Sequence, residues 1–233
     1  MTNRQIFDGT PLDVAGDSSS PRAVIVIQEA FGVNDHIREV TDRFAQAGYY
    51  AVAPELFHRA GSPEIDYDDF PGAMAAMSEI NADGIAHDLD AASSFLTAAG
   101  FAPSSTGIVG YCMGGTVTFF AATQGRVGVA ASFYGGGIDV GRFGFPPLLE
   151  LAPQLQVPWI GLYGDLDKGI PVQQVEALRL ATAASNHDTM IVRYADAEHG
   201  FHCDGRPAVF NRDDAVDAHN RTLDFFAAHL SKR

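Results

Sequence analysis

The stretch GIVGYCMGG, residues 107–115, places one cysteine between a short apolar run and a glycine-rich segment. The apolar run predicts a strand, and the residues after Cys112 predict the start of a helix. Such a strand-to-helix turn is sharp and strained, so a side chain at Gly110 or Gly114 would collide with neighbouring backbone. The pattern Gly-x-Cys-x-Gly is therefore typical of a turn that presents a nucleophile, with cysteine in the serine position.

The position of Cys112 also predicts its chemistry. A cysteine at a helix N-terminus meets the positive end of the helix dipole, which favours the thiolate over the thiol. The alternative is a buried, inert cysteine beside a glycine-rich helix contact. The placement between a strand and a helix favours the reactive cysteine.

Strands and helices alternate on both sides of this turn. Residues 23–28, AVIVIQ, form a continuous apolar run, as expected of a strand buried on both faces. After an opening hairpin at 4–15, further strands are predicted at 49–53, 106–110, 127–133, 157–163 and 189–195, and helices at 35–47, 72–80, 83–99, 114–124, 171–184 and 213–230. This order predicts an α/β fold with a mostly parallel central sheet and helices on both faces. We expect residues 1–233 to form a single domain.

Composition narrows the range of partners. The chain is 46% hydrophobic, which suits one globular domain with a sizeable core. Its formal net charge of -14 argues against nucleic acid and anionic membranes as partners. No apolar run approaches the roughly 18 residues of a membrane helix, and the N-terminus MTNRQIFDGT lacks a secretory signal. The two cysteines do not support a disulfide framework. We therefore expect a cytoplasmic protein.

Two further strand ends carry polar side chains that could meet Cys112, because ligands bind at the carboxyl ends of parallel strands. The first is GDLDKGIP, 164–171, where Asp167 is the preferred orienting acid and Asp165 is interpreted as a turn or capping residue. The second is AEHGFH, 197–202. His199 fits the chain order nucleophile, acid, histidine, and His202 is the reserve candidate. The other loop or helix histidines are interpreted as surface or core residues.

These residues predict a mechanism. His199 would take the thiol proton and return it to the leaving oxygen, while Asp167 fixes the imidazole tautomer. The developing oxyanion needs backbone donors, for which the N–H groups of Met113 and Ala30 are best placed.

Several stretches in order along the chain resemble the dienelactone hydrolase family, the carboxymethylenebutenolidases. They are VIVIQEAFGVNDHIREV at 24–40, GYCMGG at 110–115, GDLDKGIP at 164–171, EHGFHCDGRP at 198–207 and RTLDFFAAHL at 221–230. The resemblance implies an α/β-hydrolase fold and a triad of Cys112, His199 and Asp167. It also implies hydrolysis of an enol lactone or related small ester, without a metal or organic cofactor.

The resemblance implies one more catalytic residue, Glu29 in the motif Gln-Glu-x-Phe-Gly. In the family this glutamate reaches the nucleophile and helps to activate the thiol. A carboxylate can accept a thiol proton but repels a thiolate that has already formed. A Glu–thiol pair at rest and a His–thiolate pair at work would then be alternatives. Glu29 could also be an acid that only bonds to backbone.

The chain departs from the family where the substrate carboxylate is held. Cys203 stands nearest to the position of one family arginine, and Arg206 follows a few residues later as the candidate replacement. No arginine or lysine occurs from residue 60 to residue 125. Phe70, Met74 and Met77 in that segment could instead form an apolar substrate wall or simply pack the core. His58 and Arg59 could supply a polar contact. These features argue against tight binding of small anionic lactones.

The favoured hypothesis is a cysteine-dependent hydrolase of a small ester or lactone. The alternatives are a binding or regulatory protein that uses the same cleft without turnover, and a redox thiol sensor that uses Cys112, with or without Cys203.

Overall fold

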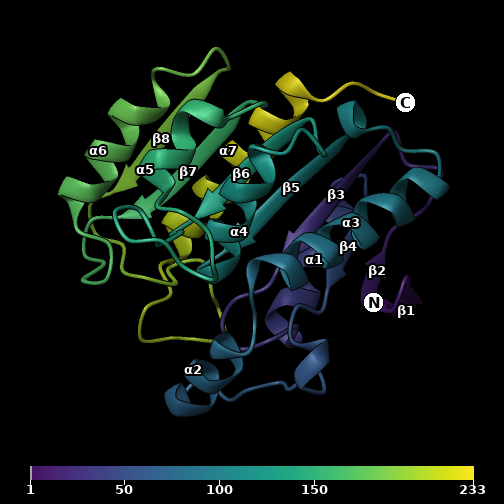
Figure 1. Ribbon diagram of the computed structural model, residues 1–233, viewed down its shortest axis with the longest axis horizontal. Coiled ribbons are helices and arrows are strands. Elements are labelled where there is room, and N and C mark those ends of the chain that lie inside the picture. The colour runs from purple at the N-terminus through teal and green to yellow at the C-terminus, as the bar shows by residue number, and fades with distance from the viewer. Residues whose placement is uncertain (1) are drawn as a thin grey trace.

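The computed structural model describes residues 2–233, and within them eight strands form one sheet in the order β1-β2-β4-β3-β5-β6-β7-β8 (Figure 1). The strands are β1 (Asn3–Phe7), β2 (Thr10–Ala15), β3 (Arg22–Ile27), β4 (Tyr49–Pro54), β5 (Thr106–Tyr111), β6 (Val129–Phe133), β7 (Trp159–Gly164) and β8 (Thr189–Tyr194). The helices are α1 (Asp35–Gln46), α2 (Phe70–Ser78), α3 (Ala82–Ala98), α4 (Met113–Ala122), α5 (Leu148–Leu151), α6 (Val172–Thr182) and α7 (Arg212–His229).

The pairing of β3 to β8 is parallel throughout, and β1 and β2 add an antiparallel edge. Asp8 and Gly9 close the β1–β2 hairpin with positive φ angles of 47° and 78°. A two-residue turn of this kind matches the right-handed twist of paired strands. The predicted hairpin and the mostly parallel sheet are therefore confirmed.

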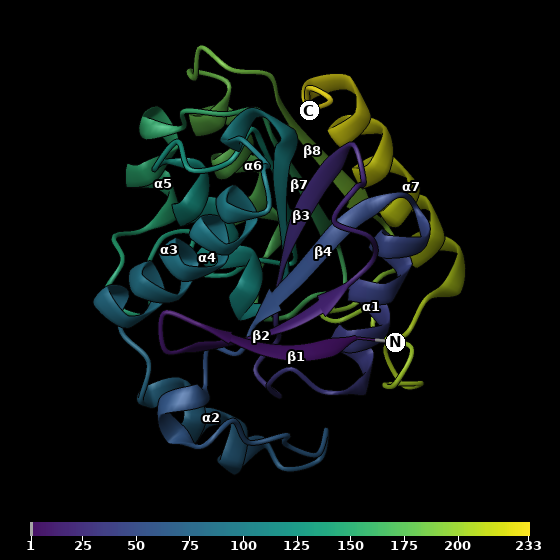
Figure 2. The ribbon, with the colours of Figure 1, turned by 90° about the vertical axis from the view of Figure 1, so that its right-hand side faces the viewer.

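Helices cover both faces of the sheet (Figure 2). One face carries α1 and α7, and the other carries α3, α4 and α5. The rings of Phe44 in α1 and Phe226 in α7 stack with centroids 6.3 Å apart. Residues Ala23 to Ile27 of β3 are all 0% exposed, as expected of a strand covered on both sides.

The predicted elements recur with ends shifted by a few residues. The exception is α5, which has four residues and is too short to show a helical period in the sequence. Helix α2 lies apart from the sheet, at the carboxyl-end side of the strands, where it can border a site (Figures 1 and 2).

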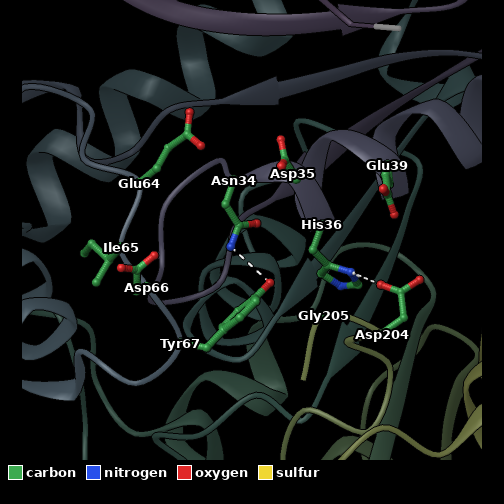
Figure 3. Close-up of a pocket in the computed structure, with 10 residues that line it drawn as sticks. All are labelled: Asn34, Asp35, His36, Glu39, Glu64, Ile65, Asp66, Tyr67, Asp204 and Gly205. Carbon is green, nitrogen blue, oxygen red and sulfur yellow. Dashed lines mark hydrogen bonds and ion pairs between the residues drawn. The ribbon is translucent and has the colours of Figure 1, made fainter. Parts of the chain in front are cut away.

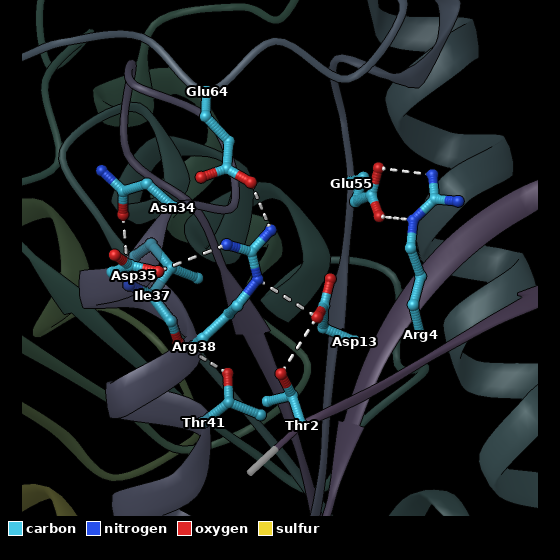
Figure 4. Close-up of polar contacts among 10 residues, drawn as sticks. All are labelled: Thr2, Arg4, Asp13, Asn34, Asp35, Ile37, Arg38, Thr41, Glu55 and Glu64. Atoms are coloured by element: carbon cyan, nitrogen blue, oxygen red, sulfur yellow. Dashed lines mark hydrogen bonds and ion pairs between the residues drawn. The ribbon is translucent and has the colours of Figure 1, made fainter.

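A network of charged residues attaches the antiparallel edge to α1 and to the segment before α2 (Figure 4). Arg38 of α1 donates to Asp13 of β2 at 3.3 Å and to Glu64 at 2.7 Å. Arg4 forms a bidentate pair with Glu55 at the end of β4. Asp13 is 4% exposed, and its burial raises the pKa of its carboxyl. The arginine contacts compensate this buried charge and hold the segment that leads to α2.

Candidate active site

Cys112 lies between β5 and α4 in a strained conformation, with φ 55° and ψ -116°. The flanking glycines make this turn possible. A Cβ atom on Gly110 would lie 2.1 Å from the carbonyl oxygen of Gly114, and one on Gly114 would lie 2.5 Å from those of Ile27 and Gln28. Only glycine fits either position, as predicted. The close approach also brings the loop after β3 beside the N-terminus of α4.

Asp167 follows β7 and is held by the backbone of its own turn. Its Oδ1 atom accepts hydrogen bonds from the N–H groups of Gly169 at 2.8 Å and Ile170 at 3.2 Å. The side chain is 2% exposed. These contacts leave Oδ2 free to face the loop that carries His199.

His199 Nδ1 lies 2.6 Å from Asp167 Oδ2. Burial lowers the pKa of His199, but the charge of the nearby Cys112 sulfur and the hydrogen bonds to Asp167 and Cys112 outweigh it and raise the pKa to about 10. The three residues therefore meet in the order sulfur, imidazole, carboxylate. Asp165 lies in the turn after β7, as predicted, where it pairs with Arg193 at 2.7 Å and caps no helix.

A cavity of about 390 Å³ opens beside these residues. Its lining includes Cys112, Met113, His199, Phe70, Met77 and Arg206. Met74, which was predicted to share this wall, is 64% exposed and does not line the cavity, because it lies on the outer side of α2.

Three basic side chains surround the cavity, two of which sequence reasoning did not identify. Arg142, Lys168 and Arg206 line it, and within residues 2–233 none of them pairs with a carboxylate. The Arg206 guanidinium lies 5.6 Å from the centre of the Phe31 ring. Lys168 is adjacent to Asp167 in sequence and could have been noticed. Arg142 lies in the long glycine-rich segment after β6, and nothing in its spacing points to the cavity.

Glu29 is 2% exposed, and its carboxylate accepts a hydrogen bond from the Tyr134 hydroxyl at 3.0 Å. The Tyr134 ring in turn lies 5.0 Å from the His199 ring, measured between centroids. In the part of the chain that the structure describes, Glu29 thus contacts the site through Tyr134. Sequence reasoning missed Tyr134, which has a positive φ of 38° just after β6.

The reserve and secondary candidates lie elsewhere. His202 is 1% exposed and packs on the Tyr111 ring at 4.9 Å, and burial depresses its pKa well below the usual value. His58 and Arg59 both contact Asp88, at 3.0 and 2.8 Å. Their polar groups are therefore used in a structural ion pair and not in the cavity.

The two predicted oxyanion donors flank the same turn. Met113 is the first residue of α4, so its N–H has no acceptor within the helix. Ala30, 7% exposed, follows the β3 end that Gly114 contacts. Both backbone positions are compatible with a carbonyl oxygen held beside Cys112.

Comparison with known proteins gives a consistent result. The sequence model of the Dienelactone hydrolase family matches residues 13–230. The chain is 36% identical over 222 residues to a "Putative carboxymethylenebutenolidase" of Salmonella typhimurium, covering 94% of this chain and 81% of that protein. It is 29% identical to the carboxymethylenebutenolidase of Pseudomonas putida, covering 98% and 96%.

Among solved structures, a "Putative Dienelactone Hydrolase" from Klebsiella pneumoniae superimposes with a TM-score of 0.88 at 33% identity, covering 98% of this chain and 99% of the other. Among residues 2–233, no helix combines the length and apolar character needed to cross a membrane.

Proposed function

Because this chain belongs to the dienelactone hydrolase family, we propose that it hydrolyses small esters or lactones through an acyl-enzyme on Cys112. The observation that carries the proposal is the 2.6 Å contact between His199 Nδ1 and Asp167 Oδ2, beside a cavity that Cys112 also lines. All strands belong to one sheet, which supports treating residues 1–233 as one catalytic domain.

In the proposed reaction, His199 first takes the Cys112 proton, and the thiolate attacks the substrate carbonyl carbon. The carbon–oxygen ester bond then breaks, and the leaving oxygen receives the proton from His199. A water molecule loses a proton to His199 and attacks the thioester, which releases a carboxylic acid and restores the thiol. Asp167 keeps the imidazole oriented through both half-reactions.

The tetrahedral intermediate carries an oxyanion, which we assign to the N–H groups of Met113 and Ala30. Glu29 would exchange between two partners. In a resting state it would accept a hydrogen bond from the Cys112 thiol, and it would turn to the Tyr134 hydroxyl once the thiolate pairs with His199. The 3.0 Å Tyr134–Glu29 hydrogen bond supports the second arrangement.

The cavity suggests the substrate class. Phe70 and Met77 offer an apolar wall for a small acyl group. Arg142, Lys168 and Arg206 supply positive charge and form no ion pair within residues 2–233, although Glu198 also lines the cavity. An arginine fork binds a carboxylate with two parallel hydrogen bonds. We therefore propose an ester or lactone that carries an anionic group, despite the lack of basic residues in the segment before β5.

The direct test is Cys112→Ala assayed with an activated aryl ester. Removal of the nucleophile is expected to lower kcat by about 10³-fold or more. The purified variant must keep the circular dichroism spectrum and thermal midpoint of the parent. Turnover retained by a folded Cys112→Ala protein would contradict the acyl-enzyme. Stabilisation by ligands with no hydrolysis of any ester by the parent would instead indicate a binding protein.

The charge of the substrate is tested separately with Arg142→Ala and Arg206→Ala. Each variant is expected to lose about 10- to 100-fold in kcat/KM for anionic lactones, and much less for neutral esters of the same size. Equal losses on both substrate classes would remove the anion-binding role but leave the hydrolase intact.

A further inference from the structure

The second cysteine lies in a cluster of its own, behind Tyr134. Cys203, His36 and Glu29 are 0%, 4% and 2% exposed. One ligand atom from each lies within 4.8 Å of the others. A thiol sulfur, an imidazole nitrogen and a carboxylate oxygen are the three donor types that zinc takes in proteins.

The imidazole of His36 is oriented as a metal ligand is. Its Nδ1 atom lies 2.8 Å from Asp204 Oδ1, as Figure 3 shows. Its Nε2 atom is buried and meets no hydrogen-bond partner of good geometry among residues 2–233, and the Cys203 side chain is a neighbour that acts on this imidazole besides Asp204. A buried polar atom without a partner is costly, so its retention needs an explanation. A histidine whose other nitrogen is held by a carboxylate is the usual arrangement around bound zinc.

The cluster has an acidic approach from solvent. A cavity of about 490 Å³ is lined by His36, Tyr67 and Asp204. Four more carboxylates border it, on Asp35, Glu39, Glu64 and Asp66 (Figure 3). An acidic cleft raises the local concentration of cations. The Tyr67 hydroxyl, 3.3 Å from the Cys203 sulfur, lies between this cavity and the cluster.

We propose that Glu29, His36 and Cys203 bind one divalent cation of the zinc class, with a fourth position left for water. Ligand atoms of a tetrahedral zinc site lie about 3.5 Å apart, so the three ligand atoms, now within 4.8 Å of one another, would each need to close by at most about 1.3 Å on binding. The Cys203 thiol loses its proton to solvent as the sulfur–metal bond forms, and any proton on His36 Nε2 is likewise released to solvent before that nitrogen binds the metal. The expectation of no metal, drawn from the family resemblance, would then be incomplete. The proposed site shares Glu29 with the proposed hydrolase mechanism, but its test reads out metal binding and not hydrolysis, so the two proposals can fail separately.

The experiment uses the full chain with Cys112→Ser, because the cavity thiol could itself bind metal. Titration with Co²⁺ is expected to produce thiolate-to-cobalt charge transfer and tetrahedral d–d bands. Zn²⁺ should remove them at one equivalent per chain, and Mg²⁺ should not compete, because it prefers oxygen ligands. Adding Cys203→Ser should abolish the thiolate charge-transfer band. Adding His36→Asn should weaken metal binding at least about 100-fold.

Two carboxylate variants make a matched pair in the same background. Asp204→Asn is expected to weaken Zn²⁺ binding about 10- to 100-fold, because Asp204 orients a ligand. Asp188→Asn is the control, since Asp188 contacts His229 at 3.0 Å on the surface. It should leave the affinity unchanged.

Absence of the cobalt bands in the Cys112→Ser protein at about 1 mM metal would overturn the proposal, since zinc sites bind far more tightly. A thiolate-to-cobalt charge-transfer band that persists after Cys203→Ser would also overturn the proposal. Should the Cys203 or His36 variants fail to fold, Glu29→Gln and Asp204→Asn decide. Unchanged affinity in both would refute the site, and weakened affinity in both would support it.

Discussion

The molecule contains two groups made of cysteine, histidine and aspartate, and their burial is inverted. In the first, the His199 side chain is 34% exposed and the Asp167 side chain 2%. In the second, the His36 side chain is 2% exposed and the Asp204 side chain 37%. Cys112 is partly exposed at a cavity, whereas Cys203 is buried. The cysteine thus faces a cavity in one group and the interior in the other.

The inversion has a chemical consequence. A nucleophile must reach a carbonyl carbon, and its orienting acid works best when water is excluded from it. The Cys112 group satisfies both conditions. The Cys203 group satisfies neither, because its sulfur cannot meet an ester and its acid is open to water. Geometry therefore favours the Cys112 group, and not the Cys203 group, for the proposed catalysis.

The largest expected difference between the groups is catalytic. Asp167→Asn should lower kcat about 10³- to 10⁴-fold, because the imidazole loses its tautomer and orientation. Asp204→Asn should lower kcat less than about tenfold. Steady-state kinetics on one activated ester measure both variants. Losses of similar size would mean that the two groups act as one unit.

The second largest difference is expected in the reactivity of the two thiols. With iodoacetamide at neutral pH, Cys112 is expected to be alkylated at least about 100-fold faster than Cys203, because only Cys112 is accessible and lies beside a cationic histidine. Peptide mass spectrometry after timed quenching gives the two rates. Both thiols should react alike in denaturant. Comparable rates in the native protein would remove the distinction in access.

The glycines beside each cysteine should differ in their effect on stability. Gly114→Ala should lower the free energy of unfolding by about 2–3 kcal/mol, because the new Cβ meets two backbone carbonyls that cannot move. Gly205→Ala should cost about 1 kcal/mol or less, because its nearest neighbour is the Tyr67 ring, 2.8 Å away, which can shift. Urea denaturation compares them. Equal costs would show that the turn at Cys112 is less constrained than its geometry implies.

The smallest expected effect is on the pH profile. The raised pKa of His199 means that its imidazolium is present at neutral pH and is lost as the pH rises through about 10. The proton for the leaving oxygen is lost with it, so kcat/KM should fall about tenfold per pH unit above that value. In Asp167→Asn this alkaline limb should move to lower pH, since Asp167 helps to raise the pKa. In Asp204→Asn it should stay in place.

Local patterns in the sequence were sufficient to predict the fold and to place Cys112, Asp167 and His199 at one edge of the sheet. The strand at 23–28 and the Gly-x-Cys-x-Gly turn each depend on residues close together along the chain, and Asp167 and His199 were each found just after a predicted strand. Strand alternation then places these turns at one edge of a parallel sheet. Burial, periodicity and turn chemistry are local properties, so the sequence alone determined the architecture and the position of the reacting groups.

Only the tertiary structure decided which distant side chains meet. Arg142 reaches the cavity from a loop, Glu29 bonds to a tyrosine 105 residues away, and His36 faces Cys203 across the interior. Met74 turns away from the wall that its neighbour Met77 forms. These outcomes depend on how helices and loops pack over the sheet. Each such contact joins two segments that are far apart along the chain. No local sequence pattern predicts which of their side chains will meet, because this depends on how the segments pack in three dimensions.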